Sequence, residues 1–145
     1  MLSSEVKSVF ARCIKSLFVF LHHPRQIPQN LIGLGLRLFC RGEKIRKISG
    51  IAVYYLNSFP GGISLGETIM VGSLCEFTAK HERGHQIQSK ILGPLYLFVI
   101  GIPSICWACL YGTKLFPPTY NGYYRFYTER WADKLGGVKR QYAYT

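Results

Sequence analysis

Two histidines and a glutamate in the segment FTAKHERGHQIQSK, residues 77–90, have the types and the spacing that metal-assisted hydrolysis needs. His81 and His85 are four positions apart, and on a helix two such residues lie on one face, where both imidazoles can bind the same ion. Glu82 follows the first histidine directly, so its carboxylate can reach a water molecule at that ion and act as a general base. The alternative interpretation is an ordinary polar helix on which this spacing has no chemical role.

A catalytic zinc site also needs a third protein ligand and one open position. Glu129 is the best candidate, because Asp133, the only aspartate of the chain, follows it by four residues and the two carboxylates then share a helix face. Glu129 would bind the ion, and Asp133 would accept the second ring N–H of a ligand histidine. His22 and His23 are further candidates for the third ligand, in a proline-flanked segment upstream. An amphipathic helix with intrahelical ion pairs would also explain the segment ERWADK without a metal.

The two histidines and the two carboxylates are each expected to lie on a helix, which would bring them to one site. The histidines are expected on a helix over residues 76–92, which a Gly-Pro pair ends. Gly84 inside it costs about 1 kcal/mol relative to alanine, and a residue this small would let another backbone approach. The carboxylates are expected on a last helix that begins near Thr128, whose hydroxyl can cap it, and that ends at a Gly-Gly pair, residues 136–137.

The remaining pattern predicts strands before the histidines and a short helix before the strands. Residues 48–56, ISGIAVYYL, and 63–72, ISLGETIMVG, each read as one strand, with a turn between them. A helix over residues 31–40 would be capped by Asn30. The basic segment that follows it, residues 41–47, is expected to be a solvated connector.

The composition favours a membrane partner. The net charge is +11, from 18 Lys and Arg against 7 Asp and Glu, while hydrophobic residues make up 48% of the chain and charged residues only 17%. Such a chain suits an anionic membrane surface better than a nucleic acid, for which it also lacks any known binding motif. Residues 5–21 predict an amphipathic helix with a basic face, which would pack either on lipid or on the protein core. Five irregularly spaced cysteines argue against a disulfide framework, and Cys106 and Cys109 are expected to be buried free thiols.

Residues 91–113 carry no charge and are long enough to cross a bilayer once. A single straight span would put the histidines and Glu129 on opposite sides of the membrane, so it excludes the metal site. If the site forms, this segment must fold back, and Pro94 and the stretch 101–103 are where a turn is expected.

The motif HERGH followed by ERWADKLGG resembles the gluzincin metallopeptidases, which combine HExxH with a downstream ExxADxxG. It is most similar to the CAAX prenyl endopeptidase and heat-shock membrane protease families and to the minigluzincins, over roughly residues 62–137. The resemblance implies Zn²⁺ bound by His81, His85 and Glu129, with Glu82 as the catalytic base. It also implies a substrate-binding edge strand before the metal helix, which would comprise Ile63, Ser64, Leu65 and Gly66. The membrane families, however, carry longer apolar insertions between the two motifs.

We therefore predict an α+β, zincin-like fold: a small β-sheet, the HExxH helix, an apolar helical hairpin and a C-terminal helix that bears Glu129. Residues 1–60 would hold amphipathic helices and the first strand and associate with a membrane, and residues 61–145 would be the catalytic core, in one continuous domain. The predicted function is a membrane-associated zinc metallopeptidase that cleaves a peptide or protein substrate through a zinc-activated water, with its active site facing the cytoplasm. Its oxyanion stabiliser would be one of four tyrosines, Tyr120, Tyr123, Tyr124 and Tyr127. The alternatives are a non-enzymatic integral membrane protein with one span at residues 91–113, and a zincin that binds metal and peptides without cleaving them.

Overall fold

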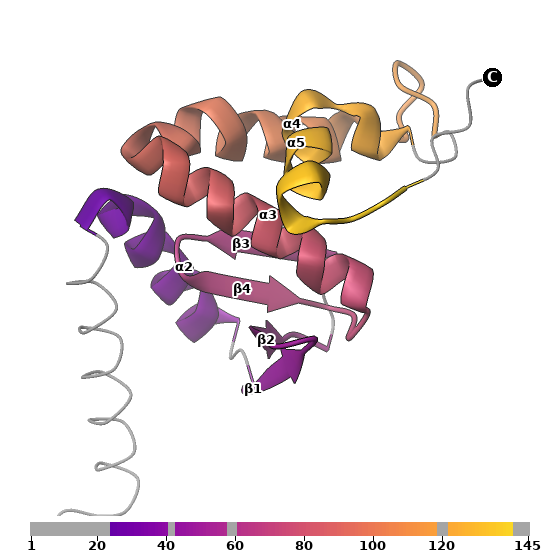
Figure 1. Ribbon diagram of the computed structural model, residues 1–145. Helices are drawn as coiled ribbons and strands as arrows, with labels where there is room; N and C mark the ends of the chain where they lie inside the picture. Colours follow the sequence, from indigo (N-terminus) through magenta and orange to yellow (C-terminus); the bar gives the residue numbers. More distant parts are fainter. Residues whose placement is uncertain (1–23, 41–42, 58–60, 119–121, 141–145) are drawn as a thin grey trace, which may run out of the picture.

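The computed structural model describes residues 24–40, 43–57, 61–118 and 122–140 (Figure 1). In chain order the elements are η1 (Pro24–Gln26), α2 (Ile27–Phe39), β1 (Glu43–Ile48), β2 (Ile51–Tyr55), β3 (Gly62–Leu65), β4 (Thr68–Val71), α3 (Glu76–Leu92), η2 (Gly93–Leu95), η3 (Leu97–Gly101), α4 (Ile102–Leu110), η4 (Tyr123–Arg125) and α5 (Tyr127–Gly136). The predicted helix over residues 5–21 lies outside the described residues, as do His22 and His23.

The four strands form one mixed sheet in the order β1-β2-β4-β3. The pairs β1–β2 and β3–β4 are antiparallel, and β2 and β4 run parallel to each other. The predicted α+β class is confirmed. The order places β3 at one edge of the sheet, directly before β4 and the histidine helix in the chain.

Each of the two predicted strands is wrong in the same way, because a two-residue turn breaks it. Ser49 and Gly50, both with positive φ, turn the chain between β1 and β2, as tight hairpins require. The basic segment expected as a connector therefore forms most of β1. Gly66, with φ 60°, turns the chain between β3 and β4.

Asn30 does not cap a helix, because α2 already begins at Ile27 with Pro28 in its first turn. Its side chain is buried, and its Oδ1 accepts the main-chain N–H of Glu67 at 2.8 Å. The residue therefore ties α2 to the β3–β4 turn, where Gly66 leaves the room for it. A polar residue at this position could serve either role, and only the packing decides between them.

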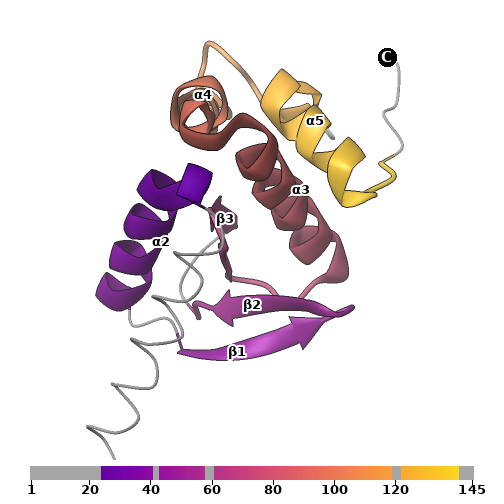
Figure 2. The same ribbon diagram turned by 60° about the vertical axis from the view of Figure 1, so that its left-hand side comes forward.

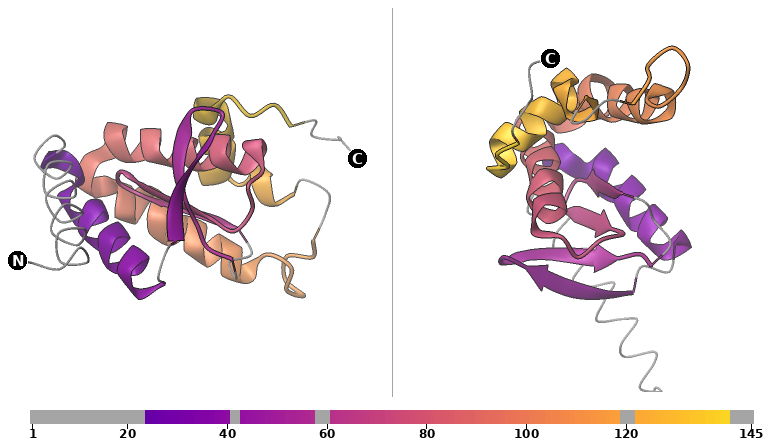
Figure 3. Two further views of the ribbon diagram at one scale, coloured as in Figure 1. Left: turned by 90° about the horizontal axis from the view of Figure 1, so that it is seen from below. Right: turned by 90° about the vertical axis from the view of Figure 1, so that its right-hand side faces the viewer.

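The helices α2 and α3 cover different faces of the sheet (Figure 2). On one face Ile69 and Val71 pack with Ala79 of α3 in a small core. On the other face Gly33 of α2 lies against Leu65 and Thr68. Side chains alternate between faces along a strand, so Gly62 and Ser64, which pair with Val71 and Ile69, face α3. The helix α5 lies on the side of α3 that points away from the sheet (Figures 1 and 3).

The apolar segment after α3 folds back at Gly93, whose φ is 56°, and returns along α3 through η2, η3 and α4 (Figure 1). The second turn expected at residues 101–103 is wrong: the π-helical η3 continues directly into α4. Pro103 lies in the first turn of α4, where its missing N–H breaks no helical hydrogen bond. The hairpin is thus built from α3 and residues 93–110 together.

No straight span forms over residues 91–113, since that segment is divided among four helical elements. Within the described ranges, no helix has the length and apolarity that a bilayer crossing requires. None of the nine residues of α4, all of them described, is buried. Cys106 and Cys109 are free but exposed, so the expectation that they are buried thiols is wrong.

Candidate metal centre

The helices α3 and α5 touch backbone to backbone because glycines line their crossing. A Cβ atom added at Gly84 would lie 1.9 Å from the main-chain oxygen of Ala132, and one at Gly136 would lie 2.0 Å from that of Lys80. No other residue can occupy either position without moving one helix away from the other. The sequence predicted a close backbone approach at Gly84, and the structure identifies the partner as α5.

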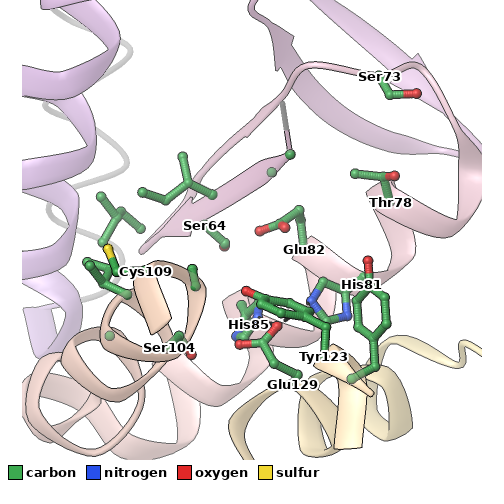
Figure 4. A pocket seen from close by; sticks show the side chains of 18 of the residues that line it. Ser64, Ser73, Thr78, His81, Glu82, His85, Ser104, Cys109, Tyr123 and Glu129 are labelled. Carbon is green, nitrogen blue, oxygen red and sulfur yellow. Dashed lines mark hydrogen bonds and ion pairs between the residues drawn. The ribbon is translucent and has the colours of Figure 1, made fainter. Parts of the chain in front are cut away.

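This crossing brings the predicted ligands together (Figure 4). One carboxylate oxygen of Glu129, Oε2, lies 3.0 Å from Nε2 of His81 and 3.4 Å from Nε2 of His85. All three side chains are buried, and their donor atoms lie within 4.8 Å of one another. Ligands about 2 Å from a tetrahedral zinc ion are about 3.3 Å apart, and two imidazoles with one carboxylate are a common zinc donor set. The residues present therefore fit this metal.

A second layer of side chains holds the ring of His81. Its Nδ1 lies 2.7 Å from Oδ1 of Asp133, and the other oxygen of Asp133 accepts a hydrogen bond from Nε of Arg140 at 2.8 Å. The guanidinium of Arg140 also lies over the ring of Tyr124, which packs perpendicular to the ring of His81. Sequence reasoning missed Arg140, which lies beyond the last helix, where no spacing rule links it to the motif.

Carboxylates therefore flank both ring nitrogens of His81. Burial alone lowers the pKa of His81, but its hydrogen bonds to Asp133 and Glu129 outweigh burial and raise the pKa to about 9. Burial raises the pKa of Glu129, and the hydrogen bonds from His81 and His85 reverse that effect and hold the pKa well below its usual range. The pKa of Asp133 is lowered too, since bonds to His81 and Arg140 outweigh its burial. The carboxylates stay ionised at neutral pH and suit a cation.

Glu82 lies between this centre and the edge strand (Figure 4). Its carboxylate packs against Gly62, where an added Cβ would be 2.3 Å from Oε1. Its Oε2 is buried and has no hydrogen-bond partner among the described residues. Burial raises the pKa of Glu82, against the opposing effect of the two histidines. A buried carboxylate oxygen without a partner is costly, so it suits a water molecule or a substrate group.

A pocket of about 510 Å³ opens over these residues. Its lining combines the edge strand β3, the helix α3 and one face of α4; the residues from these elements include Gly62, Ile63, Ser64, Leu65, His81, Glu82, His85, Ser104 and Ala108. Gly66, predicted with the edge strand, lies instead in the turn behind it, against Asn30. The buried hydroxyls of Ser64 and Ser104 have no hydrogen-bond partner within the described part of the chain.

The tyrosine cluster divides into residues near the centre and residues away from it. Tyr123 and Tyr124 line the pocket, and burial raises the pKa of each, so both keep their proton at neutral pH. Tyr127 is half exposed and donates its hydroxyl to the main-chain oxygen of Val99, and it does not line the pocket. Tyr120 lies outside the described residues. Sequence reasoning missed Tyr96, whose buried hydroxyl donates to the main-chain oxygen of Ser64 at 3.0 Å.

The carboxylate helix begins at Tyr127 with Phe126 as its cap, so Thr128 is not the cap. The Thr128 hydroxyl instead donates to Oε1 of Glu129 at 3.1 Å, whereas the contacts to the two histidines are made by Oε2.

Comparison of the chain with protein-family models, with curated proteins and with solved structures found no match in any of the three.

Proposed function

We propose that the protein is a membrane-associated zinc metallopeptidase of the gluzincin type. The observation that carries this proposal is the convergence of His81, His85 and Glu129 from two helices onto one point, with Glu82 buried beside it at the wall of a pocket. Two imidazoles, one carboxylate and a nearby general base are the groups that hydrolysis of a peptide bond at a zinc ion requires.

Zinc held by these three residues would supply a Lewis acid that acidifies a water molecule at neutral pH. Glu82 would take the proton from that water and return it to the leaving amine of the substrate. Tyr123 and Tyr124, which keep their protons, would donate hydrogen bonds to the carbonyl oxygen as negative charge develops on it. Asp133 would keep the ring of His81 oriented throughout.

The substrate would bind by pairing with the outer edge of β3, where Tyr96 already bonds to the main-chain oxygen of Ser64. Only alternate residues of an antiparallel strand bond to their partner, and Gly61 accepts the N–H of Gly72 at 2.8 Å. Gly62 and Ser64 therefore direct their main-chain groups away from β4. An extended peptide paired there would run alongside Glu82, because Gly62 is packed directly against its carboxylate.

Membrane association is supported by unpartnered apolar faces together with the excess of positive charge. Phe98 is 70% exposed, and Ile102 and Ile105 of α4, which has no buried residue, are 53% and 59% exposed. Phe39 at the end of α2 is 86% exposed. With a net charge of +11, these faces suit an anionic bilayer surface, such as the cytoplasmic leaflet that the proposed orientation requires. Sedimentation with anionic vesicles, but not with neutral ones, would support this part of the proposal, and equal sedimentation with both would contradict it.

Elemental analysis and a peptide-cleavage assay on the purified protein test the peptidase itself. We expect one zinc ion per chain, and we expect Glu82→Gln to keep the zinc and abolish hydrolysis. Glu76→Gln is the matched control, because Glu76 lies on the same helix, exposed and paired with Lys80. Absence of bound zinc would refute the proposal. Zinc binding and peptide binding without cleavage in the wild type would identify a zincin that has lost its activity.

A further inference from the structure

Gln88 connects the two helices of the centre through both ends of its amide. It is fully buried on α3, one turn after His85. Its Oε1 lies 2.8 Å from Nδ1 of His85, and its Nε2 donates to the main-chain oxygen of Thr128 at 2.9 Å. Thr128 directly precedes Glu129, so this side chain contacts one proposed ligand, His85, and the chain neighbour of another.

These contacts fix the orientation of the Gln88 amide and the position of one hydrogen atom on the ring of His85. A main-chain oxygen only accepts hydrogen bonds, so the NH₂ group of Gln88 must face Thr128 and its oxygen must face His85. The amide oxygen also only accepts, so Nδ1 of His85 must carry the hydrogen. The other ring nitrogen, Nε2, is the atom that lies 3.4 Å from Glu129.

We propose that Gln88 is a positioning residue that holds His85 as its Nδ1–H tautomer and thereby presents Nε2 to the metal. This inference rests on the proposed function, since it assigns a role toward the same ion. His81 receives the corresponding support from the carboxylate of Asp133. Gln88 supports His85 through a neutral amide, so the centre gains no negative charge beyond that of its carboxylates.

Two substitutions distinguish the hydrogen bond of Gln88 to His85 from its hydrogen bond to Thr128. Gln88→Met has a similar length and removes both hydrogen bonds, whereas Gln88→Glu keeps an acceptor for His85 and loses the donor to Thr128. Gln86→Met is the matched control, because Gln86 is on the same helix, is half-buried and bonds to Glu67 away from the centre. The full chain would be titrated with zinc against a chromophoric chelator. The nitrogen shifts of His85 in the zinc-loaded protein would be read by long-range ¹H–¹⁵N correlation.

We expect zinc on Nε2 and hydrogen on Nδ1 of His85 in the wild type and in Gln88→Glu. We expect zinc affinity to fall about 10- to 100-fold in Gln88→Met, and to change by about twofold or less in Gln86→Met. Zinc bound through Nδ1, or wild-type affinity in Gln88→Met, would overturn the inference and leave the peptidase proposal intact. A wild-type protein that binds no zinc would remove both. If Gln88→Met does not fold, the tautomer still decides the assignment. Hydrogen on Nδ1 of His85 in both the wild type and Gln88→Glu supports it, and zinc on Nδ1 in either protein contradicts it.

Discussion

The close crossing of α3 and α5 predicts that Gly84→Ala damages the proposed metal centre, although alanine favours the helix. Alanine has a helix propensity about 1 kcal/mol better than that of glycine. Its Cβ, however, would lie 1.9 Å from the main-chain oxygen of Ala132, and real contacts of this kind are not shorter than 3.0 Å. The helices must separate by at least about 1.1 Å, which exceeds the roughly 0.2 Å tolerance of metal–ligand distances.

The displaced helix carries Glu129, so the third ligand would move away from the two histidines. We expect zinc affinity to fall by about 100-fold in Gly84→Ala, measured by chelator competition on protein whose circular dichroism still shows a folded chain. Gly35→Ala is the control, because Gly35 also lies inside a helix but has open space where the Cβ would be. It should gain stability and keep its zinc affinity. Wild-type affinity in Gly84→Ala would refute the argument that this crossing sets the site.

Three further outcomes follow from the same geometry. Glu129→Ala should lose most of its zinc, because only two protein ligands remain, and elemental analysis after gel filtration would measure this; full zinc occupancy would contradict it. Without metal, the pKa of His81 is raised to about 9 from 6.5. The stability that protonated His81 contributes is therefore fully present below pH 6.5 and is lost as the pH rises through 9. Chemical unfolding of chelator-treated protein at several pH values would detect this loss. If Tyr123 donates to the oxyanion, Tyr123→Phe should lower kcat by about 100-fold with little change in KM, whereas Tyr127→Phe, outside the pocket, should leave both unchanged.

The helices and their facing residues could be predicted because the signals are local. The four-residue spacing of His81 and His85 fixes a shared face by helix geometry alone, and the only aspartate of the chain draws attention to Glu129. The contact between α5 and α3 was predicted only because a metal site needs a third ligand. Gly84 was the one local feature of the sequence that indicated it.

The strands and the supporting residues were harder to predict for different physical reasons. Ser49 adopts a positive φ that serine seldom takes, so the turn before β2 had no strong signal. The charged strand β1 lies at the outer edge of the sheet, where burial imposes no alternation and charge is common. The roles of Gln88 and Tyr96 depend on main-chain oxygens of distant elements, which no spacing along the sequence reveals.

The hydrogen bond from Tyr96 to Ser64 also affects the tendency of β3 to pair with the same strand of another molecule. An open strand edge is a template for pairing between molecules and a source of aggregation, yet β3 needs an open edge if it is to hold a peptide. The phenol of Tyr96 occupies the main-chain oxygen of Ser64, and the strand is only four residues long. A strand this short, with one of its outward oxygens already bonded, offers a second copy of the chain less of an edge to pair with.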